Sequence, residues 1–283
     1  MKRYFFLTVF LLACLLSCDK ASEPVESDRT YSFHTDTLYC QRDGLNIFGI
    51  AYVPDGQNEQ WPLVIYSHGI GSSHEAGEPY AQVLARKGYA VYTFDFCGAN
   101  SHSKSDGNTG KMTIFTEQED LTAIVGRLRL LPYIDSKRIY LLGISLGGLV
   151  SAMTAASIPD DIRGLILLYP ALCAPDDARK IYDEDGTPLN PHGRGMGGDY
   201  YNKAMLKYDP FEHIGAYTKP VYIIHGTADK LVPITYSERA VNVYPDARLE
   251  RIEGAGHGFK GEVLDKAIQL VGIQLDKWER RKP

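Results

Sequence analysis

Short apolar runs alternate with helical stretches from residue 31 to the end of this 283-residue chain, and that alternation limits the possible folds more than any other feature. The runs are continuously hydrophobic, as strands covered on both faces must be. They lie at residues 62–67, 89–94, 138–142, 164–169 and 220–224, and the helical stretches lie at 79–87, 116–131, 146–157, 236–244 and 261–280. Two earlier runs, 31–40 and 45–53, flank Asp43-Gly44 and predict an antiparallel hairpin. The pattern predicts an α/β fold with a mostly parallel central sheet and helices on both faces.

The composition is that of a globular domain with a sizeable core, because 44% of the residues are hydrophobic and 23% are charged. A formal net charge of −5 offers no basic excess to displace counterions from phosphate, so we expect no nucleic-acid partner. No Cys-x-x-Cys pair or Cys/His cluster occurs in the sequence, so we expect no metal site.

The N-terminal segment has the pattern of an export signal. A basic start is followed by an apolar run at residues 4–16, which is shorter than the roughly 20 residues of a membrane span. The run leads into Leu-Leu-Ser-Cys ending at Cys18, which resembles a bacterial lipobox, where a peptidase cuts before a cysteine that is then diacylated. An ordinary cleavage site beside a chance cysteine is the alternative.

We therefore expect a lipoprotein signal peptide at residues 1–17, a polar tether at 18–30 and a folded domain at 31–283. The lipid anchor on Cys18 would hold the domain to a membrane of the bacterial cell envelope, in the periplasm or at the cell surface. Three cysteines remain in the domain, so at most one internal disulfide can form there: Cys40, Cys97 and Cys173.

Ser145 is the candidate nucleophile. The apolar run 138–142 leads directly into Gly-Ile-Ser-Leu-Gly-Gly at 143–148 and then into a helical stretch. A Gly-x-Ser-x-Gly sequence between a strand and a helix is typical of a nucleophile elbow, a strained turn that exposes the serine.

Two later strand ends supply a base and an acid, which a weakly nucleophilic serine requires. Asp229 follows the run 220–224 in His-Gly-Thr-Ala-Asp, and His257 follows a run at 247–252 in Gly-Ala-Gly-His-Gly-Phe. The predicted catalytic triad is therefore Ser145, Asp229 and His257. Asp95, which also ends a strand, is the alternative acid.

The region from residue 31 to the C-terminus resembles the α/β-hydrolase superfamily in these three motifs, and more narrowly the bacterial cinnamoyl or feruloyl esterases. The narrower resemblance rests on Ser-Asp-Gly at 105–107, Met-Thr at 112–113, Gly-Gly-Asp-Tyr at 197–200 and Tyr-Asp-Pro at 208–210. It implies a serine carboxylesterase that needs no cofactor and cleaves hydroxycinnamoyl esters of plant cell-wall polysaccharide. Its partner would be a small aromatic ester or a feruloylated oligosaccharide.

Backbone donors for the developing oxyanion are expected on two loops. The N–H of Leu146, directly after the nucleophile, is one. The other is the N–H of Ile70, in a Ser-His-Gly-Ile-Gly segment at 67–71 that resembles the superfamily's His-Gly-x motif. His68 in this segment is expected to brace the loop.

The long connection at 171–219 is rich in Asp, Gly, Pro and Tyr, and its length predicts a lid insert. By the family resemblance, Tyr200 and Asp176 are candidates to bind the substrate's aromatic hydroxyl. A solvated acidic loop is the alternative for Asp176. Tyr201, Tyr208 and Phe211 could instead form the insert's own core.

The remaining polar residues are predicted to be structural. His225 is expected to pack below Asp229, and an acidic helix start at 116–120 indicates capping. The other histidines are predicted to be surface or loop residues: His34, His74, His102, His192 and His213.

Three other functions stay open. A prolyl-oligopeptidase-like peptidase and an acetyl or short-chain acyl esterase would use the same triad. Outside enzymes, the chain could be a lipid-anchored glycan-binding module on a hydrolase scaffold, although an intact triad weighs against that.

Overall fold

The computed structural model describes residue 1 and residues 30–56, 59–189 and 197–280. The expected signal peptide, Cys18 and nearly all of the tether lie outside the described residues, as does His192. Within the described ranges, no helix is both long and apolar enough to cross a membrane.

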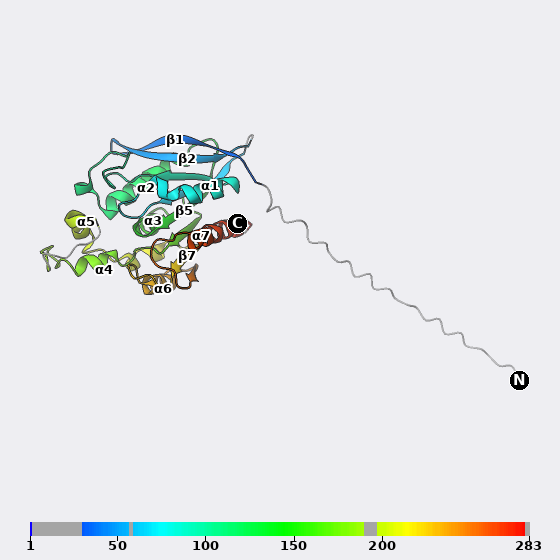
Figure 1. Ribbon diagram of the computed structural model, residues 1–283. Coiled ribbons are helices and arrows are strands. Elements are labelled where there is room, and N and C mark those ends of the chain that lie inside the picture. The colour runs from blue at the N-terminus through cyan, green and yellow to red at the C-terminus, as the bar shows by residue number, and fades with distance from the viewer. Residues whose placement is uncertain (2–29, 57–58, 190–196, 281–283) are drawn as a thin grey trace.

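The described chain forms an eight-stranded sheet in the order β1-β2-β4-β3-β5-β6-β7-β8 (Figure 1). The strands are β1 (Phe33–Arg42), β2 (Leu45–Pro54), β3 (Trp61–Ser67), β4 (Ala90–Phe94), β5 (Ile134–Ile144), β6 (Gly164–Leu168), β7 (Val221–Gly226) and β8 (Ala247–Ile252). Strand β2 is antiparallel to both neighbours, and every pair from β4 to β8 is parallel. The predicted hairpin and the mostly parallel sheet are confirmed.

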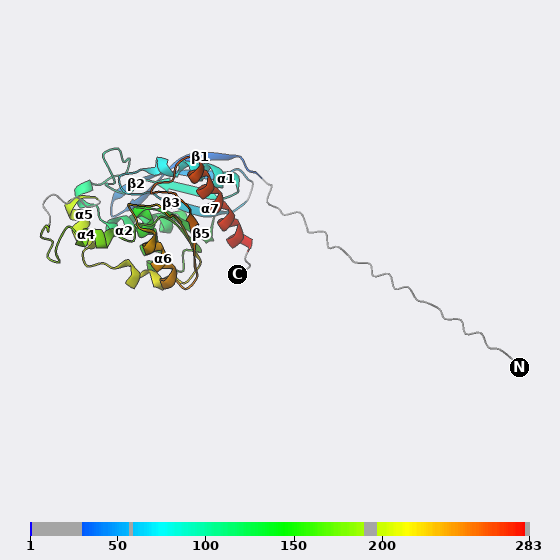
Figure 2. The same ribbon diagram turned by 60° about the horizontal axis from the view of Figure 1, so that its bottom comes forward.

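Helices cover both faces of the sheet, as the alternating pattern predicts. One face packs against α2 (Ile114–Leu128), α3 (Leu146–Ser157) and α6 (Ile234–Val243). The other packs against α1 (Glu78–Arg86) and α7 (Glu262–Arg280), and Figure 2 shows α7 crossing the molecule beside α1. The α/β-hydrolase fold is therefore confirmed.

The connection at 171–219 contributes two short helices, α4 (Ala174–Arg179) and α5 (Gly198–Met205), which lie together at one end of the molecule (Figures 1 and 2). Tyr201 and Phe211 are buried in the same core as α2 and α3, so they join the domain's core and do not form a separate one. Short 3-10 turns complete the described elements, at His74–Gly77, Thr109–Lys111, Pro210–Glu212 and Ile214–Ala216.

The capping predicted at the start of α2 is present, as a box in which the Thr113 hydroxyl accepts from the Thr116 N–H and the Thr116 hydroxyl accepts from the Thr113 N–H. The acidic side chains that follow Thr116 do not make this cap. Glu117 and Asp120 are instead buried. Asp120 accepts from Arg42 Nε at 2.6 Å, and Glu117 accepts from the Tyr201 hydroxyl on α5. These acids attach the hairpin and the insert to α2.

The three domain cysteines, Cys40, Cys97 and Cys173, are buried free thiols. Burial raises the pKa of each, to about 11 for Cys40 and about 12 for the other two. They are therefore protonated, unreactive core residues at neutral pH.

Candidate active site

Ser145 occupies a strained turn between β5 and α3. Its backbone has φ 52° and ψ −119°, a conformation that non-glycine residues rarely adopt. A side chain at Gly147 would collide with the carbonyl oxygens of Ser67 and His68, at the end of β3. The glycine therefore lets the elbow pack tightly beside the loop that follows β3.

The structure brings Ser145, His257 and Asp229 into one hydrogen-bonded chain. Ser145 Oγ lies 3.0 Å from His257 Nε2, and His257 Nδ1 lies 2.8 Å from Asp229 Oδ2. Because Nδ1 faces a carboxylate, it carries the proton and leaves Nε2 free to accept from the serine hydroxyl. The Asp229 carboxylate is fully buried, whereas His257 is 20% exposed.

The loop after β3 runs beside the nucleophile. A Cβ added to Gly69 would lie 3.3 Å from Ser145 Cβ, so the backbone at Gly69 approaches the elbow closely. Leu146 is the first residue of α3, where an N–H has no acceptor within the helix. Among the described residues, no acceptor bonds to the backbone N–H of Leu146 or of Ile70. Both are thus available as oxyanion donors, and their roles stay predictions.

His68 braces this loop, as expected. Its ring is buried, and Nε2 accepts from the Phe96 N–H at 3.2 Å while Nδ1 donates to the Gly69 carbonyl at 2.8 Å. Burial lowers the pKa of His68. The neutral ring therefore ties the loop after β3 to the loop after β4.

Asp95, the alternative acid, has different partners. Oδ1 accepts from the His74 backbone N–H and from His74 Nδ1, each at 2.7 Å, and Oδ2 accepts from the Lys104 N–H at 2.9 Å. Burial alone would raise the pKa of Asp95, but these donors outweigh it and lower the pKa. His74, predicted to be a surface or loop residue, lies in the connection between β3 and α1, but it is buried there because it folds inward onto Asp95.

The insert borders the nucleophile loop. A Cβ at Gly197, just before α5, would lie 3.0 Å from Ile70 Cδ1. Tyr200 on α5 is 58% exposed, whereas the neighbouring Tyr201 points inward to Glu117. The insert therefore borders the predicted oxyanion loop at Gly197, and the described contacts do not join Tyr200 to the triad.

Asp176 is held by its own neighbours. Oδ1 accepts from Arg179 Nη2 at 2.6 Å, and Oδ2 accepts from the Tyr236 hydroxyl at 2.7 Å. Burial tends to raise the pKa of Asp176, but these two donors lower it below its usual value. The carboxylate joins α4 to α6, and no described contact joins it to the triad.

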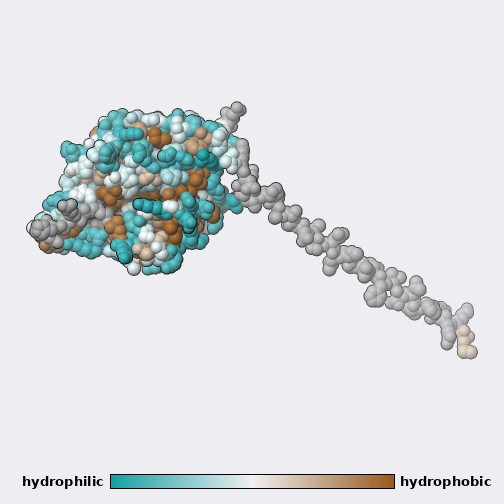
Figure 3. Space-filling model, viewed as in Figure 1, coloured by the Kyte–Doolittle hydropathy of each residue, from teal (hydrophilic) through white to brown (hydrophobic). Residues whose placement is uncertain are grey.

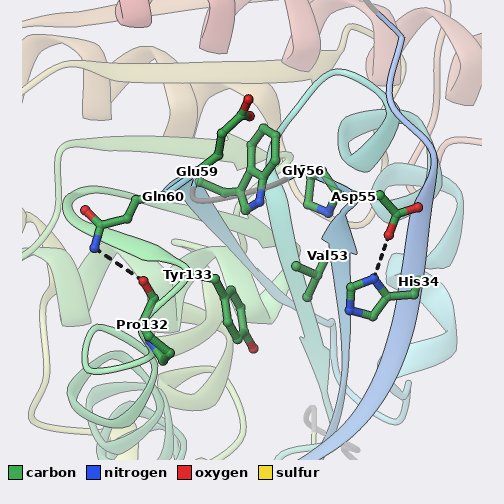
Figure 4. A pocket seen from close by; sticks show the side chains of 10 residues that line it. His34, Val53, Asp55, Gly56, Glu59, Gln60, Pro132 and Tyr133 are labelled. Carbon is green, nitrogen blue, oxygen red and sulfur yellow. Dashed lines mark hydrogen bonds and ion pairs between the residues drawn. The ribbon is translucent and has the colours of Figure 1, made fainter.

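An open depression of about 950 Å³ lies elsewhere on the molecule (Figure 4). Trp61 and Tyr133 line it at the starts of β3 and β5, and His34 pairs there with Asp55 at 2.8 Å. Ser145 follows the opposite end of β5, and none of the triad lines the depression. It is therefore separate from the candidate catalytic site.

Comparisons with known proteins agree with the fold. The family described as Serine aminopeptidase, S33, matches residues 59–192, a range that includes Ser145. An uncharacterized 31.7 kDa protein of Escherichia coli is 34% identical over 97 residues, which are 34% of this chain and 32% of that protein. The match thus spans about a third of that relative. Monoglyceride lipase of Rattus norvegicus is 28% identical over 166 residues, 57% of this chain and 52% of the lipase.

A solved structure of Est1E from Butyrivibrio proteoclasticus, with ferulic acid bound, has 27% sequence identity and a TM-score of 0.72. The alignment covers 86% of this chain and 97% of Est1E. A monoacylglycerol lipase of Paleococcus ferrophilus shares the fold at 19% identity, with a TM-score of 0.61 and coverage of 87% of this chain and 99% of that one. The chain is thus similar in fold to serine hydrolases of the α/β-hydrolase type, and its Ser145–His257–Asp229 arrangement suits that chemistry.

Proposed function

We propose that the protein is a serine carboxylesterase that hydrolyses feruloyl-type hydroxycinnamoyl esters of plant cell-wall polysaccharide. The observation that carries this is the aligned chain Ser145–His257–Asp229 in the same fold as Est1E, which has been solved with ferulic acid bound. The aromatic insert beside the nucleophile loop favours a planar acyl group.

The geometry supports catalysis through an acyl-enzyme. His257 Nε2 removes the hydroxyl proton as Ser145 Oγ attacks the ester carbonyl, and Asp229 stabilises the resulting imidazolium. The oxyanion accepts from the N–H groups of Ile70 and Leu146. His257 then protonates the oxygen of the departing sugar, which leaves as the free alcohol. In the second half, His257 takes a proton from water as the water oxygen attacks the acyl carbonyl, and that proton passes to Ser145 Oγ as the free acid leaves. These steps use no metal or cofactor.

Substrate orientation is assigned to the insert. Tyr200 is exposed and free to meet the phenol of a hydroxycinnamate. Asp176 already accepts one bond on each oxygen, but a carboxylate oxygen has a second lone pair for a substrate hydroxyl.

An ester panel on wild type and Ser145→Ala tests the proposal. We expect methyl ferulate to be cleaved with a higher kcat/KM than p-nitrophenyl acetate or an aminoacyl-naphthylamide. Ser145→Ala should lower every rate by about 10³-fold or more, because the nucleophile is lost. A preference for the acetate would assign a short-chain esterase. A preference for the amide would assign a peptidase, which the match to the serine aminopeptidase family makes the second candidate.

Labelling by a fluorophosphonate distinguishes an enzyme from a binding module. A competent Ser145 should react covalently, and Ser145→Ala should not. An unlabelled wild-type protein that still binds feruloylated oligosaccharide would support a glycan-binding module instead.

A further inference from the structure

His225 lies directly behind the proposed catalytic acid and has no step in the mechanism above. It is fully buried near the end of β7, where it pairs in register with Arg251 of β8. Its Nε2 lies 3.3 Å from Asp229 Oδ2 and 3.0 Å from the Val232 carbonyl oxygen. The ring is thus rigidly placed against the carboxylate.

The neighbours of His225 determine its tautomer. Both atoms that face Nε2 are acceptors, so Nε2 must carry the hydrogen. Nδ1 lies 2.7 Å from the hydroxyl of Ser237, a buried residue of α6, which can donate to it. Burial also lowers the pKa of His225, which keeps the ring neutral at pH 7.

Each oxygen of Asp229 lies beside two nitrogen atoms. Oδ1 accepts from the backbone N–H groups of Leu231 and Val232, each at 2.9 Å. Oδ2 faces both His257 Nδ1 and His225 Nε2. The carboxylate oxygen that holds the catalytic histidine therefore also contacts a second imidazole, whose Nε2–H lies between this oxygen and the Val232 carbonyl oxygen.

We propose that His225 is a positioning residue, which holds Asp229 Oδ2 in line with His257, while Ser237 holds His225 in the required tautomer. This inference rests on the proposed serine-hydrolase function. A neutral donor suits the role, because a charged His225 would weaken the attraction between Asp229 and the imidazolium that forms on His257.

Two substitutions at His225 separate its donor from its volume. Leucine fills much of the space without a donor, whereas glutamine keeps an N–H near the position of Nε2. With p-nitrophenyl acetate and methyl ferulate, His225→Leu should lower kcat by about 10- to 100-fold, the value of a hydrogen bond to a charged group. KM should change little, and His225→Gln should recover most of the lost rate. Equal losses in both variants would overturn the proposal.

A double-mutant cycle tests whether His225 acts through Asp229. In the Asp229→Ala background, His225→Leu should cause no further loss in the rate of fluorophosphonate labelling. If His225→Leu lowers the labelling rate by the same factor with and without Asp229→Ala, then His225 has a merely structural role. His74→Leu is the matched control, because His74 is a buried histidine with a carboxylate partner, Asp95, outside this chain of contacts. Any fold-loss in labelling rate that His74→Leu causes should be the same in wild type and in the Asp229→Ala background.

Thermal unfolding must show that each variant is folded. If His225→Leu is not folded, Ser237→Ala replaces it in the cycle, because this change removes only the hydroxyl that fixes the tautomer of His225. Ser237→Ala should lower kcat severalfold. In the Asp229→Ala background it should cause no further loss in the rate of labelling. A wild-type protein without labelling or ester cleavage would contradict the proposed function itself. An active wild type, in which the losses from His225→Leu and Asp229→Ala are independent, would contradict only the role of His225.

Discussion

At the scale of single residues, Ser145 carries strain that its chemistry requires. A non-glycine residue at φ 52° is unfavourable, yet this turn points Oγ at His257. Strain of this kind is retained only where the surrounding packing enforces it, and the close approach of Gly69 and Gly147 supplies that packing here.

Relief of this strain should stabilise the fold and abolish activity. We expect Ser145→Gly to be more stable than Ser145→Ala by about 1 kcal/mol, because only glycine adopts this backbone conformation without strain. Urea unfolding of the two inactive variants measures the difference. An alanine variant as stable as the glycine variant would mean that the turn is not strained.

At the scale of elements, α2 is the point of attachment for both the β1–β2 hairpin and the insert. Arg42 of β1 pairs with Asp120, and Tyr201 of α5 bonds to Glu117. Both acids are buried, so each needs a partner from an element distant in sequence.

The Arg42–Asp120 pair should be important for stability. Arg42→Met leaves an uncompensated buried carboxylate and should cost about 3 kcal/mol of unfolding free energy. Arg129→Met is the control, because Arg129 pairs with Asp161 at the same 2.6 Å but both side chains are about a third exposed. That change should cost less than about 1 kcal/mol. If urea unfolding shows that Arg42→Met and Arg129→Met lose the same unfolding free energy, the buried pair is not important for stability.

Glu117 should make the attachment of α5 dependent on pH. Burial raises the pKa of Glu117 from 4.5 to about 8, although the bond from Tyr201 lowers it in part. Because the folded state binds the proton more tightly than the unfolded state, this contribution to stability is complete below about pH 4.5 and is lost as pH rises through about 8.

The corresponding measurement is thermal unfolding of wild type and Glu117→Gln between pH 5 and 9. Relative to the glutamine variant, which cannot ionise at this position, wild type should lose stability across that range. Parallel curves for the two proteins would show that Glu117 does not titrate in the fold.

At the scale of the whole molecule, we propose that the catalytic domain is attached to a bacterial membrane only through Cys18. Removal of residues 1–17 takes away Lys2 and Arg3, so the net charge falls from −5 to about −7 and gives no attraction to anionic lipid. On the face seen in Figure 3, hydrophobic patches are separated by hydrophilic surface. Acyl chains would therefore supply the attachment.

Cys18→Ala should release the protein from the membrane fraction without loss of esterase activity. Cell fractionation with an activity assay measures both effects, and mass spectrometry of the N-terminal peptide detects the acyl groups. Retention of the variant in the membrane would contradict a lipid anchor at Cys18.

The sequence by itself determined the order of strands and helices, because continuous apolar runs and helical stretches are local patterns that chain neighbours encode. It also placed Ser145, Asp229 and His257 at strand ends, where the carboxyl edge of a parallel sheet gathers them. The hydrogen bonds that join these three residues in the structure agree with that placement.

Only the tertiary structure decided which other polar groups are buried and what they bond. His74 with Asp95 and Glu117 with Tyr201 leave no mark in local sequence patterns. The packing of His225 below Asp229 is predicted from the sequence, but its contacts with Asp229 Oδ2 and Ser237 come from the tertiary structure. A polar side chain can enter a core only when a partner satisfies it, and that partner comes from another element. The acidic start of α2 therefore has the sequence of a helix cap, while its carboxylates serve as buried attachments.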